Sequence, residues 1–371
     1  MKKQKHISLS ITERCNLNCI YCFEKSKSNK VLSFEDAVSI IDKELNADDN
    51  FDSVAIDFMG GEPFLEFDLI RSICEHYWGK STNRPILFFT TTNGTLVKGS
   101  IKEWLEINHT RFSCALSLDG TRTSHNKNRC NSFDNIDIPF FLSMWPTQKV
   151  KAIVSMITIS DLCDNVIFLH QLGFTRIEIK LAYGFDWSND DLCLKFKKEL
   201  EKLLVFYTEN SDYTPCSLLN LDLKKLLAKD EILKWCNAGI KTISYDMDGN
   251  RYPCRYFQDL RKTGKLSTEE MWAINYDEIQ ESLESPCRKC IIRNVCRTCY
   301  AQNYELNGSF GRKPMFLCFP TKIGVYYSAK LFLIRFELGK INNETIENIS
   351  EAVLACNEIE NAFCNNTWME R

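Results

Sequence analysis

The sequence predicts an α/β fold with a parallel sheet, arranged as an open or partial barrel and followed by a cysteine-rich region. Three observations support this prediction. Strand-like runs alternate with helical stretches along the first half of the chain, which is typical of βαβ units. Six such runs are present, too few to close an eight-stranded barrel. Seven cysteines then fall within 236–318, where few long periodic segments occur.

Each expected element follows from its own pattern. Short apolar or alternating runs predict strands at 6–12, 53–59, 86–92, 112–118, 151–158 and 176–182. Helical stretches lie between them at 34–46, 67–78, 99–106 and 161–172. Ser33, with Asp36 three residues on, is a start signal for the first helix. A long helix is expected near 190–209, and the tail 319–371 also has a helical pattern.

Composition limits the function classes. The net charge of −3 gives no long-range attraction to nucleic acid or to an anionic membrane. The basic N-terminus has no apolar core or cleavage site, and no apolar run reaches 18 residues, so we expect a cytoplasmic protein. Ten of the eighteen cysteines fall in two clusters, and clustered cysteines in a reducing compartment indicate metal binding rather than disulfides.

The first cysteine group, "RCNLNCIYCF" (14–23), places Cys15, Cys19 and Cys22 on one tight loop after the first strand. Three thiolates can hold three irons of a [4Fe–4S] cube and leave the fourth iron open to a small molecule. The alternatives for this loop alone are a structural zinc site or a chance spacing of cysteines. Because the active sites of parallel barrels lie at the C-terminal ends of the strands, the position of the loop favours chemistry.

With Tyr21 before its third cysteine, this loop resembles the Cys-x3-Cys-x-aromatic-Cys signature of the radical S-adenosylmethionine (SAM) superfamily. The resemblance implies that the amino and carboxylate groups of SAM chelate the open iron. "MGGEP" (59–63) resembles the GGE motif of the superfamily, which binds the SAM amino group. Gly60 and Gly61 allow close backbone approach, and Glu62 offers a carboxylate to an ammonium.

Two further segments follow the third and fourth strands. "TTNGT" (91–95) and "SLDGTRTSHNKNR" (117–129) resemble motifs of the same superfamily, although Asn126 stands where an Asp is common. Asn93 with Gly94 is equally readable as an ordinary turn. The resemblance implies that Ser117 contacts ribose and Arg129 a carboxylate. The implied SAM-site residues are Tyr21, Gly60, Gly61, Glu62, Asn93, Ser117, Asp119 and Arg129.

The second cysteine group contains "CRKCIIRNVCRTC" (287–299). Its CxxC pairs are closer than in a zinc ribbon, and seven cysteines are too many for one zinc ion. The pattern resembles the SPASM domain of peptide-modifying radical SAM enzymes, which carries two auxiliary [4Fe–4S] clusters. The resemblance implies Cys236, Cys254 and Cys299 for the first auxiliary cluster, and Cys287, Cys290, Cys296 and Cys318 for the second.

This pattern departs from the family in two places. The last gap of the run is two residues instead of three. Cys299 is therefore shifted by one position from the place of the matching cysteine in the family pattern. No cysteine occurs in 237–248, so the first auxiliary cluster has either an open iron or a ligand from elsewhere, such as Cys216. Six further cysteines are interpreted as buried thiols that behave as small apolar side chains: Cys74, Cys114, Cys163, Cys193, Cys356 and Cys364.

The resemblance covers roughly 7–320. It implies a partial (β/α)6 TIM-like barrel as the radical SAM core in 1–210, a bridging segment in 211–235, a SPASM domain in 236–320 and a helical tail in 321–371. The radical SAM loop begins at Cys15, which leaves no room before it for a leader-binding domain. A leader peptide would then be recognised by a separate protein, by the tail, or by the SPASM domain.

The implied enzyme carries three [4Fe–4S] clusters and SAM, with an external reductant such as flavodoxin or ferredoxin. Reductive cleavage of SAM would give a 5′-deoxyadenosyl radical that takes a hydrogen from a ribosomally made precursor peptide. The product would be a thioether, a carbon–carbon or ether crosslink, or an epimerised residue. The alternatives are an anaerobic sulfatase maturase forming formylglycine and, in another class, a cluster-bearing electron-transfer or scaffold protein. The sequence assigns no catalytic base.

One residue separates the two enzymatic alternatives. Sulfatase maturases that resemble this chain have an Asp base directly after the cysteine of the "DMDGNRYPC" segment, where this chain has Arg255. An arginine cannot accept a proton at working pH. Asp246 or Asp248 of the same segment could replace the base, and a second interpretation takes Arg255 as an uninformative surface charge.

Overall fold

A computed structural model describes residues 3–24, 27–223, 236–296, 298–341, 350–354, 356–357 and 359–360. The chain divides into two compact units. The first unit contains Met1–Leu118, His125–Val150 and Asn237–Tyr276, and the second contains Asp119–Ser124, Lys151–Cys236 and Asp277–Arg371. Each unit is described by itself.

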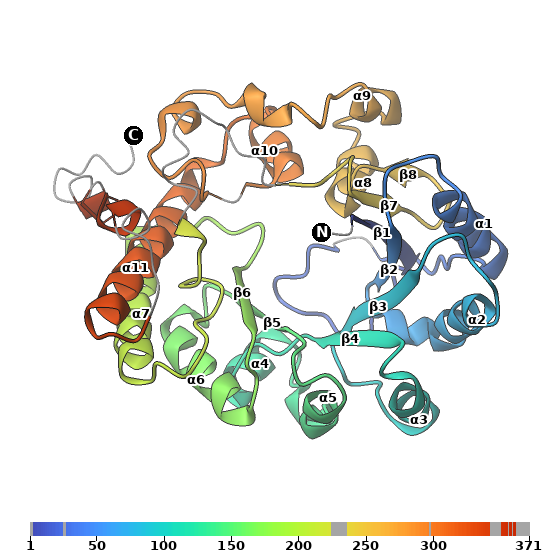
Figure 1. The fold of residues 1–371 in the computed structure, drawn as a ribbon, viewed down its shortest axis with the longest axis horizontal. Coiled ribbons are helices and arrows are strands. Elements are labelled where there is room, and N and C mark those ends of the chain that lie inside the picture. The colour runs from blue at the N-terminus through green and yellow to red at the C-terminus, as the bar shows by residue number, and fades with distance from the viewer. Residues whose placement is uncertain are drawn as a thin grey trace. The chain divides into compact units, whose positions relative to one another are not determined.

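A six-stranded sheet forms the first unit, with the strand order β4-β3-β2-β1-β7-β8 (Figure 1). Its strands are β1 (Gln4–Thr12), β2 (Ser53–Gly60), β3 (Ile86–Thr92), β4 (Phe112–Leu116), β7 (Thr242–Tyr245) and β8 (Arg251–Tyr252). Neighbours from β4 to β7 are parallel, and β8 is antiparallel to β7. Strand β1 therefore lies inside the sheet, which explains why Ile7, Leu9 and Ile11 are fully buried.

The register between β1 and β2 changes at the end that carries the first cysteine loop. Ser10 pairs with Met59, but Thr12 pairs with Gly60, so one extra residue is accommodated on β1. An irregularity of this kind bends a strand and redirects the chain that follows. Here it precedes the turn into the loop at Cys15.

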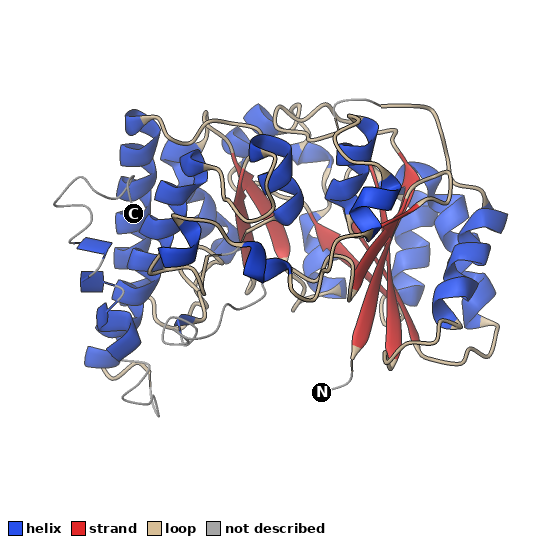
Figure 2. Cartoon of the chain, turned by 90° about the horizontal axis from the view of Figure 1, so that it is seen from above, coloured by secondary structure: helices blue, strands red, loops and turns tan. Residues whose placement is uncertain are grey.

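The helices of the first unit are α1 (Phe34–Leu45), α2 (Phe67–Trp78), α3 (Gly99–Asn108), α5 (Ile138–Met144), α8 (Arg255–Lys262) and α9 (Thr268–Trp272), with the short turns η1 (Pro63–Glu66) and η2 (Phe133–Asn135). Helix α4 (Arg122–Asn128) begins in the second unit and ends in the first. Helices α1, α2 and α3 lie on one side of the strands (Figure 1), and Figure 2 shows helices beside the strands as seen from above. The Ser33 side chain accepts from the Asp36 N–H, which confirms the expected cap of α1.

The core between the sheet and these helices is aromatic. Phe58 on β2 stacks on Phe88 of β3 and on Phe112 of β4, with ring centroids 5.8 Å and 6.3 Å apart. Trp104 of α3 meets Phe112 edge-on at 5.4 Å. Rings of this size bury large apolar areas, so this cluster holds β2, β3 and β4 in register.

The second unit contains the strands β5 (Val150–Val154) and β6 (Ile177–Leu181), which form a two-stranded sheet. Its helices are α6 (Leu162–Leu172), α7 (Asp190–Glu209), α10 (Tyr300–Asn307) and α11 (Cys318–Glu337), with the short turns η3 (Ile159–Asp161), η5 (Ile279–Ser282), η6 (Cys287–Lys289) and η7 (Met315–Leu317). Helix α11 packs along α7, where the Tyr327 hydroxyl donates to Glu201 at 2.7 Å.

All six expected strands and the expected helices of the first half are present. The expected α/β class with an incomplete barrel is confirmed, since two separate sheets form and no closed barrel is seen among the described residues. The sequence missed the β7–β8 hairpin and the helices α4, α5, α8, α9 and α10. Helix α11 begins at Cys318 and runs across the predicted boundary at 320, and the domain boundaries remain predictions. None of the described helices is long and apolar enough to cross a membrane.

Candidate functional site

The loop that follows β1 carries Cys15, Cys19 and Cys22, all three partly exposed. Its backbone is folded back on itself, since the Cys22 N–H donates to the Cys19 carbonyl at 3.1 Å. The Leu17 N–H donates to Cys15 Sγ at 3.4 Å, and Lys27 Nζ donates to the Leu17 carbonyl at 2.8 Å. Local hydrogen bonds thus shape the loop.

Gly60 and Gly61 bring the end of β2 against this loop. A Cβ on Gly60 would lie 2.5 Å from the Thr12 carbonyl oxygen, and one on Gly61 would lie 2.3 Å from that of Arg14 and 2.8 Å from Cys15 Cβ. The Glu62 N–H donates to the Arg14 carbonyl at 2.9 Å. The expected close backbone approach is therefore present, and its partner is the start of the cysteine loop.

The Glu62 side chain is buried and accepts three hydrogen bonds. Its carboxylate accepts from Thr92 Oγ1 at 2.6 Å, from the Asn93 N–H at 2.8 Å and from the Phe64 N–H at 3.3 Å. Burial raises the pKa of Glu62, while these hydrogen bonds oppose the rise. The carboxylate ties the ends of β2 and β3 together, and its contact with SAM remains a prediction.

The Asn93 side chain reaches back to the cysteine loop. Asn93 Nδ2 donates to Asn16 Oδ1 at 2.9 Å, and Asn16 Nδ2 donates to Thr95 Oγ1 at 2.8 Å. Gly94 has φ +80°, and a Cβ there would meet Leu116 at 2.7 Å, so the turn requires glycine. The segment is a turn, as one interpretation proposed, and it also anchors the loop between Cys15 and Cys19.

Ser117 and Asp119 follow β4. The Ser117 N–H donates to the Thr92 carbonyl at 2.9 Å, which holds it beside the end of β3. In the second unit, the Asp119 carboxylate accepts from the Ile153 N–H at 3.0 Å. Their contacts with SAM remain predictions.

Arg129 lies against Tyr21, with the guanidinium carbon 5.4 Å from the ring centroid. Arg129 is 8% exposed. Burial raises the pKa of the Cys22 thiol, and the charges of Lys27 and Arg129 partly offset that rise. Asn126, at the position where the family often has Asp, accepts from the Phe133 N–H at 3.0 Å and so shapes the turn after Arg129.

Cys254 precedes helix α8, and the next residue is Arg255. Arg255 is 8% exposed, forms an ion pair with Glu24, and lies 3.1 Å from Asp259 Oδ1. The interpretation of Arg255 as an uninformative surface charge is therefore wrong. The Asp246 carboxylate accepts from the N–H groups of Asp248 and Asn250 at 2.9 Å, so it stabilises its own turn.

A pocket of about 460 Å³ lies beside this ion pair. The lining comes from the end of β1, from the β2 end and from the segment after β7, and it includes Thr12, Gly60 and Arg255. Two more ion pairs, Glu13 with Lys262 and Lys30 with Asp248, surround the pocket. The C-terminal ends of parallel strands thus carry a charged recess next to the cysteine loop.

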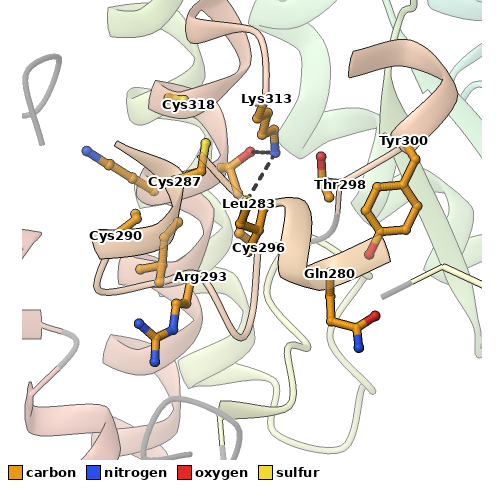
Figure 3. A pocket seen from close by; sticks show the side chains of 13 residues that line it. Gln280, Leu283, Cys287, Cys290, Arg293, Cys296, Thr298, Tyr300, Lys313 and Cys318 are labelled. Carbon is orange, nitrogen blue, oxygen red and sulfur yellow. Dashed lines mark hydrogen bonds between the residues drawn. The ribbon is translucent and has the colours of Figure 1, made fainter. Parts of the chain in front are cut away.

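The four cysteines predicted for the second auxiliary cluster line one pocket of about 570 Å³ in the second unit (Figure 3). They are Cys287, Cys290, Cys296 and Cys318. Burial raises the pKa of Cys290, and it raises the pKa of Cys318 to about 11. Burial makes these thiols harder to ionise, but iron binds thiolates. The positive charge of a cluster would therefore have to offset the cost of forming buried thiolates.

Of the three cysteines predicted for the first auxiliary cluster, Cys236 and Cys299 belong to the second unit and Cys254 to the first. Burial raises the pKa of Cys299, and the neighbouring Cys236 thiol raises it further. Cys216 is fully buried, and its N–H donates to the Tyr207 hydroxyl at 2.8 Å. Its surroundings are those of a core thiol.

The donor set of the pocket in Figure 3 consists of four cysteine thiols, which is the kind of set that holds an iron–sulfur cluster. Among the described residues, no three His, Cys, Asp or Glu side chains are close enough to hold one metal ion. Zinc draws its thiolates to about 2.3 Å. A cube of iron and sulfide is larger than one ion and holds its thiolates further apart, which suits four cysteines around a pocket.

Most of the remaining cysteines fit the buried-thiol interpretation. Cys74, Cys114, Cys163 and Cys193 are buried, Cys356 is partly exposed, and Cys364 lies outside the described residues.

Four residues were not singled out from the sequence: Asn16, Glu24, Lys313 and Lys322. Asn16 could have been found within the cysteine loop, and Lys322 by its spacing of four from Cys318 on a helix.

Comparison with known proteins agrees with these motifs. Residues 9–131 match the model of the Radical SAM superfamily. A cysteine-type anaerobic sulfatase-maturating enzyme from Clostridium perfringens is 28% identical over 275 residues, which cover 70% of this chain and 66% of that enzyme. Two other relatives are matched over less of their length. These are protein MJ0907 of Methanocaldococcus jannaschii, over 39%, and the radical SAM cyclopropyl synthase TigE of Paramaledivibacter caminithermalis, over 28%.

Two solved structures share the fold. Native anSMEcpe with bound AdoMet and Cp18Cys peptide has a TM-score of 0.70 at 20% identity, covering 90% of this chain and 99% of that one. Streptococcus suis SuiB bound to precursor peptide SuiA has a TM-score of 0.56 at 16% identity, covering 84% of this chain and 75% of that one.

The cysteine loop, the glycine approach behind it and the family match agree with one another. The match of residues 9–131 to this family implies SAM and a [4Fe–4S] cluster, which Cys15, Cys19 and Cys22 would hold. The chain therefore contains a radical SAM domain in residues 9–131, and its fold is shared with anSMEcpe and SuiB.

Proposed function

We propose that the enzyme modifies a ribosomally made peptide and carries two auxiliary clusters besides the one that binds SAM. The observation that carries this proposal over the alternatives is the buried ion pair of Arg255 with Glu24 at the position after Cys254. Both solved structures named above contain bound peptides, which supports a peptide as the class of substrate.

When bound, the first cluster would supply the electron that cleaves SAM, and the 5′-deoxyadenosyl radical would take a hydrogen atom from the peptide. In this chain, Cys15, Cys19 and Cys22 would hold three irons and leave one for SAM. Gly60 and Gly61 keep side-chain atoms out of the space behind the loop. Arg129 places a positive charge near Cys22.

The charged recess at the ends of β1 and β2 is a suitable place for the reacting peptide segment. Its ion pairs present both signs of charge, and a peptide offers both donors and acceptors to match them. A radical must meet its substrate in a site from which water is excluded. The product would be a thioether, a carbon–carbon or ether crosslink, or an epimerised residue.

The second candidate is a sulfatase maturase, favoured by the similarity to the Clostridium perfringens enzyme. That route needs a base after Cys254, and Arg255 is a cation held by two carboxylates. Asp246 is bonded to its own turn and Asp248 pairs with Lys30, so neither is ready to replace that base. The geometry therefore favours maturation of another peptide.

One experiment separates these candidates from an electron carrier. The reconstituted, reduced enzyme is incubated with SAM and either a cysteine-type sulfatase peptide or the short peptides encoded near its gene. We expect 5′-deoxyadenosine, a mass change on one of the neighbouring peptides and no formylglycine. Formylglycine on the sulfatase peptide would establish the second candidate. No 5′-deoxyadenosine under any condition would leave an electron carrier or scaffold.

The proposed enzyme needs an electron donor and a way to recognise its peptide. A flavodoxin or ferredoxin would deliver electrons, and the leader peptide would be recognised by a separate protein, by 321–371 or by the SPASM domain. The functional division remains 1–210, 211–235, 236–320 and 321–371. A cytoplasmic location fits the reduced thiols that the clusters require.

A further inference from the structure

Lys313 lies in the pocket of the second cysteine group, between α10 and η7. The side chain is buried, at 8% exposure for the residue. Its Nζ donates to Cys296 Sγ at 3.4 Å and to Thr321 Oγ1 at 2.7 Å (Figure 3). A lysine is seldom buried to this degree unless negative charge accompanies it.

The charge of the pocket lining is strongly asymmetric. Among the described residues that line it, three are cations, Arg293, Lys313 and Lys322, and none is an Asp or Glu. Lys322 is 6% exposed and lies four residues after Cys318 on α11, on the same face of the helix. Thiolates around a cluster would supply the negative charge that these ammonium groups require.

Thr321 fixes the direction in which Lys313 points. The Thr321 hydroxyl donates its single proton to the Leu317 carbonyl at 2.7 Å. A hydroxyl has one proton and two lone pairs, so Thr321 can only accept from Lys313. The ammonium is thereby anchored, with another N–H directed at Cys296 Sγ.

We propose that Lys313 is a positioning residue that sets the reduction potential of the second auxiliary cluster through an N–H···S hydrogen bond to Cys296. The inference rests on the proposed cluster at Cys287, Cys290, Cys296 and Cys318. Reduction adds one electron to a group that already carries negative charge. A buried cation hydrogen-bonded to a ligand sulfur stabilises the reduced form more than the oxidised form, so it raises the potential.

The test is a potentiometric titration, followed by electron paramagnetic resonance, of the full chain with Cys15, Cys19, Cys22 and Cys254 replaced by Ala. In this background the second auxiliary cluster is the one expected to remain, with about four irons per chain. We expect Lys313→Met to lower the midpoint potential. At fixed potential, the ratio of oxidised to reduced cluster should rise about tenfold, which equals 59 mV for one electron.

Three matched variants isolate the hydrogen bond. Lys289→Met removes the same charge from an exposed side chain next to Cys290, and it should leave the potential nearly unchanged. Lys313→Arg keeps a charged N–H donor, so its midpoint potential should stay close to that of the protein with Lys313. Thr321→Val removes the anchor without changing the charge, and it should lower the potential by less than Lys313→Met.

Iron content separates the two ways in which the inference can fail. An iron-loaded Lys313→Met variant with an unchanged or higher potential overturns the role of Lys313 and leaves the cluster in place. If Lys289→Met shifts the midpoint potential as much as Lys313→Met does, the effect comes from the loss of a positive charge and not from the hydrogen bond to Cys296. A background protein that binds no iron overturns the second auxiliary cluster and the inference with it.

Discussion

Arg255, the residue after Cys254, pairs with Glu24, two residues after Cys22, and both are 8% exposed. The pair joins the loop predicted to bind SAM to a cysteine predicted to bind an auxiliary cluster. Arg255 also lies 5.7 Å from the centroid of the Phe23 ring. One buried contact therefore fixes the spacing of two segments that are far apart in the sequence.

Breaking this pair should destabilise the first unit. We expect Glu24→Gln or Arg255→Met to lower the free energy of unfolding by about 3 kcal/mol, because either change leaves the partner as a buried, uncompensated charge. The double variant should lose less than the sum of the two single variants. Urea denaturation of the iron-free protein measures all three.

The control is the pair of Lys30 with Asp248, whose side chains are about half exposed. Lys30→Met should change the stability little, because water screens an exposed pair. Equal losses in Lys30→Met and Arg255→Met would contradict the special position of the buried pair.

Gly61 should be intolerant of any side chain. Gly61→Ala places a Cβ 2.3 Å from a backbone oxygen of Arg14, which cannot move without displacing Cys15. We expect this variant to lose the irons of the first cluster and at least tenfold in the rate of SAM cleavage. Gly79→Ala is the matched control, because its Cβ would lie 3.6 Å from the nearest atom, an ordinary contact. Full iron loading in Gly61→Ala would contradict the close approach.

Glu62 should make the stability depend on pH with a definite sign. Burial raises the pKa of Glu62 in the fold above its ordinary value of 4.5, so the folded state binds this proton more tightly than the unfolded chain. The stabilisation is present below pH 4.5 and is lost as the pH rises through the folded-state pKa. The wild type should therefore lose stability relative to Glu62→Gln over that range.

Urea unfolding of both proteins at a series of pH values measures this difference. Glu35→Gln removes an exposed carboxylate and corrects for the change in net charge. A wild-type stability that rises relative to Glu62→Gln over the same range would show that the three hydrogen bonds outweigh burial, and the sign would then be wrong.

The sequence predicted the fold class because strand and helix periods are local properties of the chain. The six strands and the cap at Ser33 were confirmed for that reason. The β7–β8 hairpin was missed because two short strands, one of them only Arg251–Tyr252, carry little periodicity. Their place in the sheet depends on parallel pairing between β1 and a segment more than two hundred residues away.

The candidate site was predictable to a similar extent. Cysteine spacing identified the two groups, and the four cysteines of the second do line one pocket. Spacing could not reveal that Lys313 reaches Cys296 or that Glu24 reaches Arg255, because both contacts are made only when distant segments fold together. A buried charge has the same sequence letter as an exposed one.

The reactivity of the thiols should follow their burial. Among the described cysteines that are not predicted ligands, Cys130 is exposed, whereas Cys163 and Cys193 are buried with pKa values raised to about 12 and about 11. Iodoacetamide reacts with the thiolate, so it should label Cys130 first in the iron-loaded protein. Peptide mass mapping over time measures this order, and the denatured protein, in which every cysteine should react, is the control. Early labelling of Cys163 would contradict its core position.

The clusters should separate when their ligands are removed. The wild type should bind about twelve irons after anaerobic reconstitution, by the count of three four-iron clusters. Replacing Cys15, Cys19 and Cys22 by Ala should leave about eight irons and abolish SAM cleavage, because the open iron predicted to bind SAM belongs to the cluster of these three cysteines. Replacing Cys287 and Cys290 should also leave about eight irons, but it should retain SAM cleavage and lose the peptide product.

Iron assay, 5′-deoxyadenosine yield and peptide mass on the same samples make the comparison complete. The variant that lacks Cys287 and Cys290 must keep the thermal unfolding temperature of the first unit for the result to count, since its substitutions lie in the second unit. A wild-type value near four irons would contradict both auxiliary clusters, and zinc in place of iron would contradict all three. Peptide modification by the variant without Cys15, Cys19 and Cys22 would overturn the mechanism, because the proposal assigns SAM cleavage to the cluster of these three cysteines alone.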